Sequence, residues 1–255
     1  MRDGIAFLLP RRDTSVTTTD VLKLVGIAFV FIDHHGYFFD PENMWWRLFG
    51  RVAAPIFFFL IGFARTRKVP WTWYAFGLVL TVVNAWKADS LWGTMINILI
   101  NFALLRALIL PPVERHVMGR PLAVALLIAG CLPLIPVTDG PLEYGAEGWL
   151  WAFLGLAHRI ALEDGTQRAL WTRNGIAAAT AVAYIVREVH DYGFTGLQSA
   201  ILVILVTGLC VVLIRFRREP LTWQPSAPLA LPFLLCGRHS LEIYGISVLI
   251  SHAVV

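Results

Sequence analysis

Long apolar runs, separated by short charged loops, recur along this chain of 255 residues. An α-helix needs about 20 mostly apolar residues to cross the ~30 Å hydrocarbon layer of a bilayer, and several of the runs approach that length. Hydrophobic residues make up 57% of the sequence and charged residues only 15%, against about 25% charged residues in soluble domains. Because a bilayer offers backbone groups no water, only helices and closed barrels cross it, and runs of this length favour helices. The sequence therefore predicts an all-α, polytopic transmembrane helix bundle.

About nine runs are candidate membrane spans, with a range of eight to ten. They cover residues 20–38, 52–64, 71–86, 94–110, 121–137, 148–158, 174–187, 198–214 and 239–255. The apolar stretch Leu229–Cys236, which precedes the last run and contains a proline, is a candidate re-entrant segment. Residues 1–17 are interpreted as a cytoplasmic or interfacial tail, because Ile5–Leu9 is too short for a signal peptide and arginines follow it. Residues 18–255 are predicted to form a single transmembrane domain.

If the runs alternate in direction, the basic residues divide unevenly between the two sides of the membrane. One side receives seventeen of the 21, namely Arg2, Arg11, Arg12, Lys23, Arg65, Arg67, Lys68, Arg106, Arg115, Arg120, Arg159, Arg168, Arg173, Arg215, Arg217, Arg218 and Arg238. The other side receives the remaining four, which are Arg47, Arg51, Lys87 and Arg187. The positive-inside rule then places the N-terminus in the cytoplasm, and nine spans place the C-terminus outside. The net charge of +4 therefore indicates topology, and we expect no nucleic-acid partner.

The first run contains ionisable residues, which are costly in a membrane and are therefore functional candidates. Lys23 lies near its inner end, and Asp33, His34 and His35 lie near its outer end. The spacing from Lys23 to His34 keeps the two on one helix face, and eleven residues at ~1.5 Å each separate them by roughly 16 Å. Such a face would connect the two sides of the membrane.

A carboxylate beside an imidazole can orient the ring and raise its basicity, as a general base requires. Adjacent residues on a helix do not face each other, so Asp33 has three open partners: His34, His35 or a backbone group. An interfacial pair of histidines with its polar edge in headgroup water explains the same residues without catalysis. The sequence leaves both interpretations open.

The second run has cationic residues at both ends. Arg51 falls at its outer boundary and needs a partner, which Asp33 or a substrate carboxylate could supply. Arg65, Arg67 and Lys68 follow its inner end. A stop signal that sets topology explains this cluster, and a site for the phosphates of a nucleotide-bearing cofactor is the alternative.

Asn97 and Asn101 lie four residues apart on one face of the fourth run. Hydrogen bonding between helices is their more usual role in a membrane, and a substrate contact is the alternative. The cysteines Cys131, Cys210 and Cys236 lie in apolar surroundings without metal-type spacing, so they predict packing and no metal site.

Three motifs in order resemble the TraX family, whose members are polytopic inner-membrane proteins named for the enzyme that N-acetylates conjugative pilin. The motifs are Asp20–Lys23, Ile32–Gly36 and Phe49–Phe59. The order continues through Thr66-Arg67 and Ile96–Ile98, so the resemblance covers roughly residues 18–105.

The stretch Pro55–Gly62 also resembles the second-span motif of a wider group of membrane acyltransferases. That group includes the acyltransferase-3 proteins and heparan-α-glucosaminide N-acetyltransferase, and its members typically end in Ser-Leu-x-x-Tyr-x-x-His. Here the frame from Ser240 is kept, but Ser247 stands where the histidine would fall. The resemblance therefore supplies no catalytic histidine at this position of the last run.

The resemblance implies a bacterial inner-membrane enzyme that moves an acyl group, acetyl above all, from cytoplasmic acetyl-CoA to an amine or hydroxyl at the outer face. It assigns the CoA phosphates to Lys23, Arg65, Arg67 and Lys68. It makes His34 the general base or a transient acyl carrier, beside Asp33 and His35. Asp20, Arg51 and Asn97 would be substrate-binding or structural polar residues. The implied partners are the lipid bilayer, acyl-CoA and an outer-face acceptor such as pilin, a sugar, a polysaccharide or a lipid.

Two other classes of function are also open for this sequence. A proton-coupled transporter would employ Asp33, His34 and Arg51 as a relay, although the inverted repeats of such proteins are not apparent in the sequence. A non-catalytic assembly protein of a pilus or envelope complex would need none of these residues for chemistry.

Overall fold

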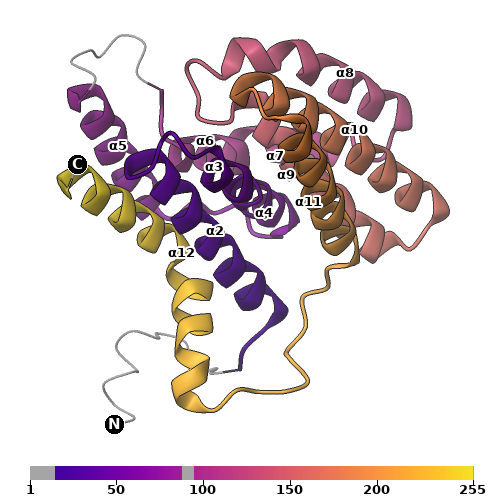
Figure 1. Cartoon of the computed structure of the whole chain (residues 1–255). Helices are drawn as coiled ribbons and strands as arrows, with labels where there is room; N and C mark the ends of the chain where they lie inside the picture. The colour runs from indigo at the N-terminus through magenta and orange to yellow at the C-terminus, as the bar shows by residue number, and fades with distance from the viewer. Residues whose placement is uncertain (1–14, 88–94, 255) are drawn as a thin grey trace. The chain divides into compact units, whose positions relative to one another are not determined.

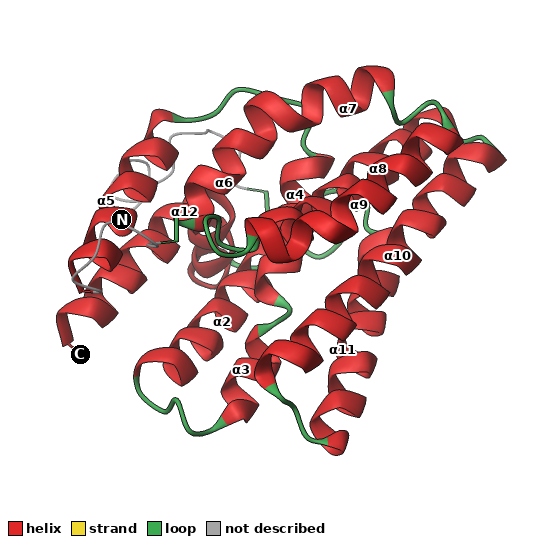
Figure 2. Ribbon diagram, turned by 90° about the horizontal axis from the view of Figure 1, so that it is seen from above, coloured by secondary structure: helices red, strands yellow, loops and turns green. Residues whose placement is uncertain are grey.

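The structure is a computed structural model that describes residues 15–87 and 95–254 (Figure 1). Within these ranges the chain consists of helices and loops, and β-pairing is limited to isolated bridges (Figure 2). The predicted all-α class is therefore confirmed for the described residues. The predicted N-terminal tail lies outside them, except for residues 15–17.

The chain divides into two compact units. Unit 1 combines the N-terminal part as far as Ile56 with Arg215–Val255, and unit 2 comprises Phe57–Ile214. The single transmembrane domain expected over residues 18–255 stays a prediction.

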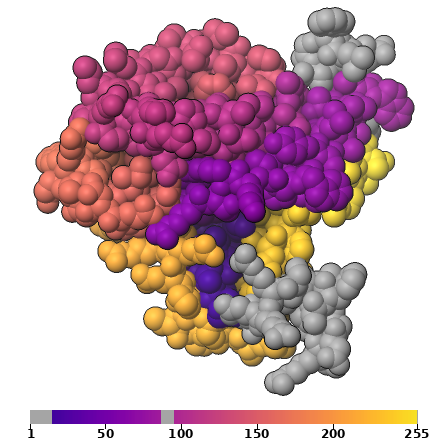
Figure 3. Space-filling model, turned by 180° about the vertical axis from the view of Figure 1, so that it is seen from behind, coloured from indigo at the N-terminus to yellow at the C-terminus, as the bar shows by residue number. Residues whose placement is uncertain are grey.

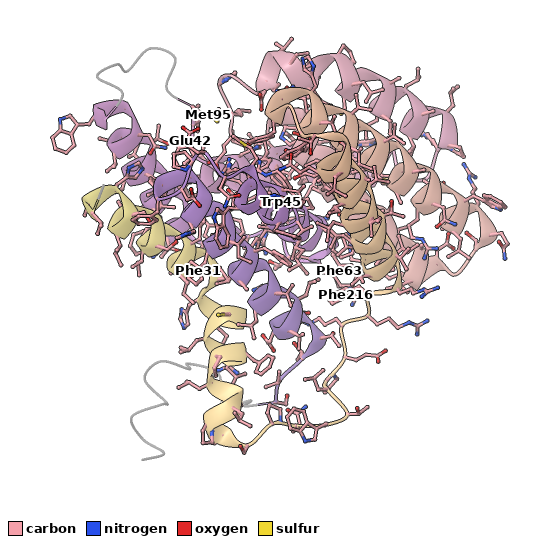
Figure 4. All side chains as sticks on the ribbon, in the orientation of Figure 1. Phe31, Glu42, Trp45, Phe63, Met95 and Phe216 are labelled. Carbon is pink, nitrogen blue, oxygen red and sulfur yellow. The ribbon has the colours of Figure 1, made fainter. Side chains whose placement is uncertain are left out.

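Unit 1 is built around α2 (Thr18–Phe38). This helix packs against α12 (Ala227–Val254) and against the short α3 (Met44–Gly50), and Figure 3 shows the indigo and yellow segments side by side. Ile27 and Val30 lie on its buried face, whereas Phe31, labelled in Figure 4, is 47% exposed. An apolar side chain exposed in this way suits a helix that faces lipid.

The start of α2 is determined by a capping box, in which a side chain at each of two positions bonds to the backbone of the other. The Thr17 side chain accepts from the Asp20 amide, and the Asp20 carboxylate accepts from the Thr17 amide at 2.9 Å. Asp20, predicted as a substrate-binding or structural residue, therefore serves as a helix cap.

Helix α12 is interrupted at His239, whose φ of −121° and ψ of 25° are not helical. Pro232, about two turns earlier, lacks an N–H and weakens the helix further. The stretch Leu229–Cys236, considered as a re-entrant segment, is helical and leads through this kink into the last predicted run.

Unit 2 contains the rest of α4 (Ala53–Phe63) and most of the remaining helices. These are α5 (Trp71–Lys87), α6 (Ile98–Leu104), the π-helix η1 (Leu105–Ile109), α7 (Leu110–His116), α8 (Pro121–Thr138), α9 (Gly145–Asp164), α10 (Gln167–Tyr192) and α11 (Gly196–Arg215). Helix α9 packs against α8 and α10, and most of its 20 residues are buried. It is the core helix of this unit.

The backbones of α4 and α9 approach each other closely because glycines lie at their contact. A Cβ at Gly62 would collide with the backbone of Ala152, and one at Gly155 would collide with the backbone of Phe59. Only glycine permits this distance. The two helices are thereby held together at the end of α4 that leads to the predicted cationic cluster.

Among the described residues, five segments are long and apolar enough to cross a membrane. They are α2, Met44–Phe63 (α3 with α4), α8, α11 and α12. The other predicted runs also fall on helices, but α5 has 17 residues, and α9 and α10 carry more charge. Helix α6 begins at Ile98, and the predicted start of that run, residue 94, lies outside the described residues.

Candidate functional site

Asp33, at the C-terminal end of α2, binds two arginines that follow it in unit 1. Nη1 of Arg47 donates to Asp33 Oδ2 at 2.7 Å and to the Asp33 carbonyl oxygen at 3.2 Å. Nη2 of Arg51 donates to the other carboxylate oxygen. Asp33 is thus the partner that the 3% exposed Arg51 requires, and the side chains that bind its carboxylate within the described residues are guanidinium groups.

Two glycines bring α2 and α3 close enough for this ion cluster. A Cβ at Gly50 would collide with the backbone and side chain of Asp33, and a Cβ at Gly36 would lie against Cβ of Trp46. Charged groups that are shielded from water interact more strongly, so the close packing strengthens the contact of Asp33 with its arginines.

His34 lies on the face of α2 that turns towards α12. Its ring is tilted against the ring of Tyr244 at 5.6 Å and meets Phe38 edge-on at 6.0 Å, and Phe38 also contacts His252 at 5.0 Å. Nδ1 of His34 is buried and has no hydrogen-bond partner among the described residues. Buried polar atoms are usually hydrogen-bonded, so an orphan nitrogen in an aromatic setting marks this ring as a candidate reactive group.

His35 is separated from His34 by its position on the helix. It is exposed, meets Trp46 edge-on at 4.7 Å and stacks on Phe39 at 5.8 Å. The two histidines, predicted together as catalytic residues, therefore contact different rings. His35 resembles the interfacial histidine that the sequence also allowed.

Lys23 lies on the same face of α2 as His34, and Ile27 between them is buried. Its Nζ donates to the carbonyl oxygen of Gly237 at 2.6 Å, two residues before the break in α12. A break of this kind leaves backbone carbonyls without helical partners, and Lys23 satisfies one. Lys23, which was predicted to bind phosphate, thus also makes a structural hydrogen bond in unit 1.

Two of the predicted cationic residues after α4 form ion pairs in unit 2. Arg65 binds Glu163 at 2.9 Å, but its side chain is 79% exposed. Arg67 binds Glu114 of α7 at 2.5 Å. Lys68 is exposed.

Two further arginines, which the sequence assigned to topology alone, join this group. Arg159 of α9 binds the second oxygen of Glu114 at 2.5 Å, and Arg106 of η1 donates to the carbonyl oxygen of Thr66 at 3.0 Å. Both arginines are buried. A charge inside or directly after an apolar run was the available signal, because a membrane protein retains such charges only where they are paired or functional.

The environment of Glu114 is dominated by its two arginines. Burial alone would raise the pKa of this carboxyl group. The hydrogen bonds and charges of Arg67 and Arg159 outweigh that effect, so the pKa of Glu114 lies below its ordinary value. Glu114 is therefore ionised at neutral pH.

Asn97 and Asn101 form hydrogen bonds within unit 2. Asn97 caps α6 by accepting from the Leu99 amide at 3.1 Å, and its Nδ2 donates to Glu143 at 3.3 Å. Asn101 donates to the Glu143 carbonyl oxygen at 2.8 Å and accepts from Trp149 at 2.9 Å. These contacts suit a structural role for both residues.

Comparisons with known proteins identify one family. The family model described as TraX protein matches residues 18–218, which extends the predicted resemblance well beyond residue 105. A comparison with curated proteins finds no match. A comparison with solved structures finds none either.

Proposed function

The chain belongs to the TraX protein family, and from this premise we propose that it is a membrane acyltransferase. It would move an acyl group, acetyl above all, from cytoplasmic acyl-CoA to an amine or hydroxyl group at the outer face. The observation that carries the proposal is the buried Nδ1 of His34, which has no hydrogen-bond partner among the described residues. A general base needs such a nitrogen, because a lone pair already engaged by the protein cannot accept a substrate proton.

His34 carries the proton in this proposal. When acyl-CoA is bound, it supplies an acyl group activated as a thioester. Nδ1 of His34 accepts the proton of the acceptor's N–H or O–H bond while the acceptor atom forms a bond to the acyl carbon. The thioester C–S bond breaks, and His34 returns the proton to the departing thiolate. All atoms are then accounted for, and His34 ends in its starting protonation state.

The neighbours of His34 orient it and exclude water. Tyr244 and Phe38 contact the ring, which limits its rotation. Asp33 holds the same end of α2 against α3 through Arg47 and Arg51, so it positions His34 through the backbone. A base that is held in place by packing loses less entropy on reaching the reactive geometry.

Each unit offers cations for the phosphates of acyl-CoA. In unit 1, Lys23 lies on the His34 face of α2, at the other end of that helix. In unit 2, Arg65, Arg67 and Lys68 follow α4. Nε of Arg67 is buried without a hydrogen-bond partner among the described residues, which fits a group that awaits an anion.

We place the protein in the bacterial inner membrane, with nine spans and a cytoplasmic N-terminus. This topology is supported by the uneven distribution of basic residues between the two sides of the membrane. The side with seventeen basic residues contains the residues proposed to bind the phosphates. The phosphate-bearing part of the donor is hydrophilic and cytoplasmic, so a cationic side that faces the cytoplasm suits it.

The proposal is tested with purified protein in proteoliposomes that contain envelope components of a strain lacking it. Labelled acetyl-CoA is added, and label in the envelope components is counted. His34→Ala should reduce transfer by about 100-fold or more, because general-base catalysis contributes about 10²–10⁴-fold. His190→Ala is the matched control, since His190 is an exposed histidine on α10.

Undiminished transfer by His34→Ala would refute the role of His34. Absence of transfer by the unaltered protein, together with ion-coupled uptake of a solute, would favour the transporter. Retained biological activity of His34→Ala without any transfer would favour the assembly protein.

A further inference from the structure

Four arginines and two glutamates gather at one end of unit 2. They are Arg65, Arg67, Arg106, Arg159, Glu114 and Glu163. They come from the segment after α4, from η1, from α7 and from the last turns of α9. Because these elements are far apart in sequence, it is the folding of unit 2 that brings their charged side chains together.

Glu114 is the centre of this group. Its two carboxylate oxygens bind Arg67 and Arg159, each at 2.5 Å. Its side chain is 34% exposed, whereas those of the two arginines are 19% and 10% exposed. A ligand from solvent can therefore reach the bridging position, and the arginines behind it are held in place.

The group carries more positive charge than its own carboxylates neutralise. Four guanidinium groups oppose two carboxylates, which leaves an excess of two positive charges (four minus two). Arg106 is 9% exposed, lies over the Trp73 ring at 5.1 Å and is repelled by Arg67. Buried charges of one sign are costly unless an opposite charge compensates them.

Two N–H donors of the group are buried inside unit 2. Nε of Arg67 and Nε of Arg159 are buried and have no hydrogen-bond partner among the described residues. Arg159 is itself only 8% exposed, so bulk solvent hardly reaches its guanidinium group. Guanidinium groups bind phosphate oxygens through paired N–H donors, and an unused Nε–H beside an occupied Nη is one half of such a pair.

We propose that Arg67, Arg106 and Arg159 form a binding site for a phosphate dianion, and that Glu114 occupies the place of that phosphate until the ligand displaces it. The dianion matches the excess of two positive charges. Glu114 lowers the affinity of the site, and in return it keeps the buried arginines paired when no ligand is bound. The site lies wholly within unit 2.

Under the proposed function the phosphate belongs to the CoA moiety, and in this respect the inference rests on that function. Free inorganic phosphates offer the same chemistry. The two sources are distinguished by comparing pyrophosphate, CoA and dephospho-CoA, because dephospho-CoA lacks the monoester phosphate of CoA but keeps the rest of the molecule.

The test measures ligand binding by the purified full-length protein in detergent micelles, from the rise in Tm with ligand concentration. Glu114→Gln keeps the size of the side chain but removes the competing charge. It should bind pyrophosphate and CoA at least about fivefold more tightly, since a neutral amide competes less strongly than a carboxylate for the guanidinium groups. Glu42→Gln is the control, because Glu42, labelled in Figure 4, is an exposed carboxylate in unit 1.

Arg159→Gln should weaken binding of both ligands about tenfold or more, and Arg159→Lys should restore part of it. Should Arg159→Gln fail to fold, the comparison of Glu114→Gln with Glu42→Gln decides alone. Equal affinities of these two variants would overturn the inference, as would unchanged binding by a folded Arg159→Gln. A preference of at least about tenfold for CoA over dephospho-CoA would identify CoA as the ligand, and equal binding with strong pyrophosphate binding would identify a free phosphate.

The outcome is independent of the acyl-transfer assay. Binding that Glu114→Gln strengthens, in a protein that transfers no acetyl group, would support this site and refute the acyltransferase. Acetyl transfer by a protein in which substitutions of Glu114 and Arg159 leave phosphate binding unchanged would support the acyltransferase and refute this site.

Discussion

Replacing Asp33 with alanine removes the carboxylate that Arg47 and Arg51 share. Arg51 is 3% exposed, so water cannot replace the lost partner. Each hydrogen bond to a charged group contributes roughly 1.5–3 kcal/mol, and two such contacts disappear. Removing one partner of a buried ion pair costs about 3–5 kcal/mol. We therefore expect Asp33→Ala to lower the free energy of unfolding by about 3–5 kcal/mol.

The measurement is the equilibrium unfolding of purified protein in mixed micelles, followed by circular dichroism. Glu42→Gln should change the free energy of unfolding by less than about 0.5 kcal/mol, because Glu42 is exposed. Replacing Asp33, Arg47 and Arg51 together with apolar residues should recover much of the loss, since no charge is then left unpaired. A loss below about 1 kcal/mol for Asp33→Ala would show that these ions are hydrated, and the reasoning would fail.

Two further predictions concern packing and pH. Gly50→Ala should destabilise the protein by about 1–3 kcal/mol, because the added Cβ would collide with the backbone of Asp33. Gly119→Ala, which has open space around it, should not destabilise the protein, and thermal unfolding of both variants checks this. Glu114, whose pKa is lowered in the folded protein, should contribute stability at pH values above its ordinary pKa of 4.5, and this contribution should be lost as the pH falls through its folded pKa. Glu114→Gln should therefore show a smaller loss of Tm between neutral and acidic pH than the unaltered protein, and an equal loss in both would contradict the assignment.

Much of the helical structure could be predicted from the sequence, because hydrophobic runs and capping residues are local signals. The run 20–38 corresponds to α2, and the run 121–137 corresponds to α8. The need of Arg51 for a partner was also visible, since a guanidinium at the edge of an apolar run must be paired. Asp33 was a predicted partner of Arg51, because the alternation of the predicted spans places both residues at the outer side of the membrane.

The contacts of Glu114 could not be predicted in this way. Arg67 and Arg159 lie 47 and 45 residues from it, and no periodicity relates residues so far apart on different helices. The different environments of His34 and His35 could not be predicted either. They arise because Tyr244 of α12 contacts the ring of His34, whereas Trp46 contacts the ring of His35. Side-chain partners of this kind are decided by how helices pack.

In the proposed function the protein transfers an acyl group to an envelope component through His34. This transfer is tested most directly by mass spectrometry of the envelope from a strain that lacks the protein and is complemented with the unaltered chain, His34→Ala or His190→Ala. We expect one envelope component to gain the mass of an acyl group with the unaltered chain and with His190→Ala, and to stay unmodified with His34→Ala. The same acylated component in all three strains would refute acyl transfer through His34.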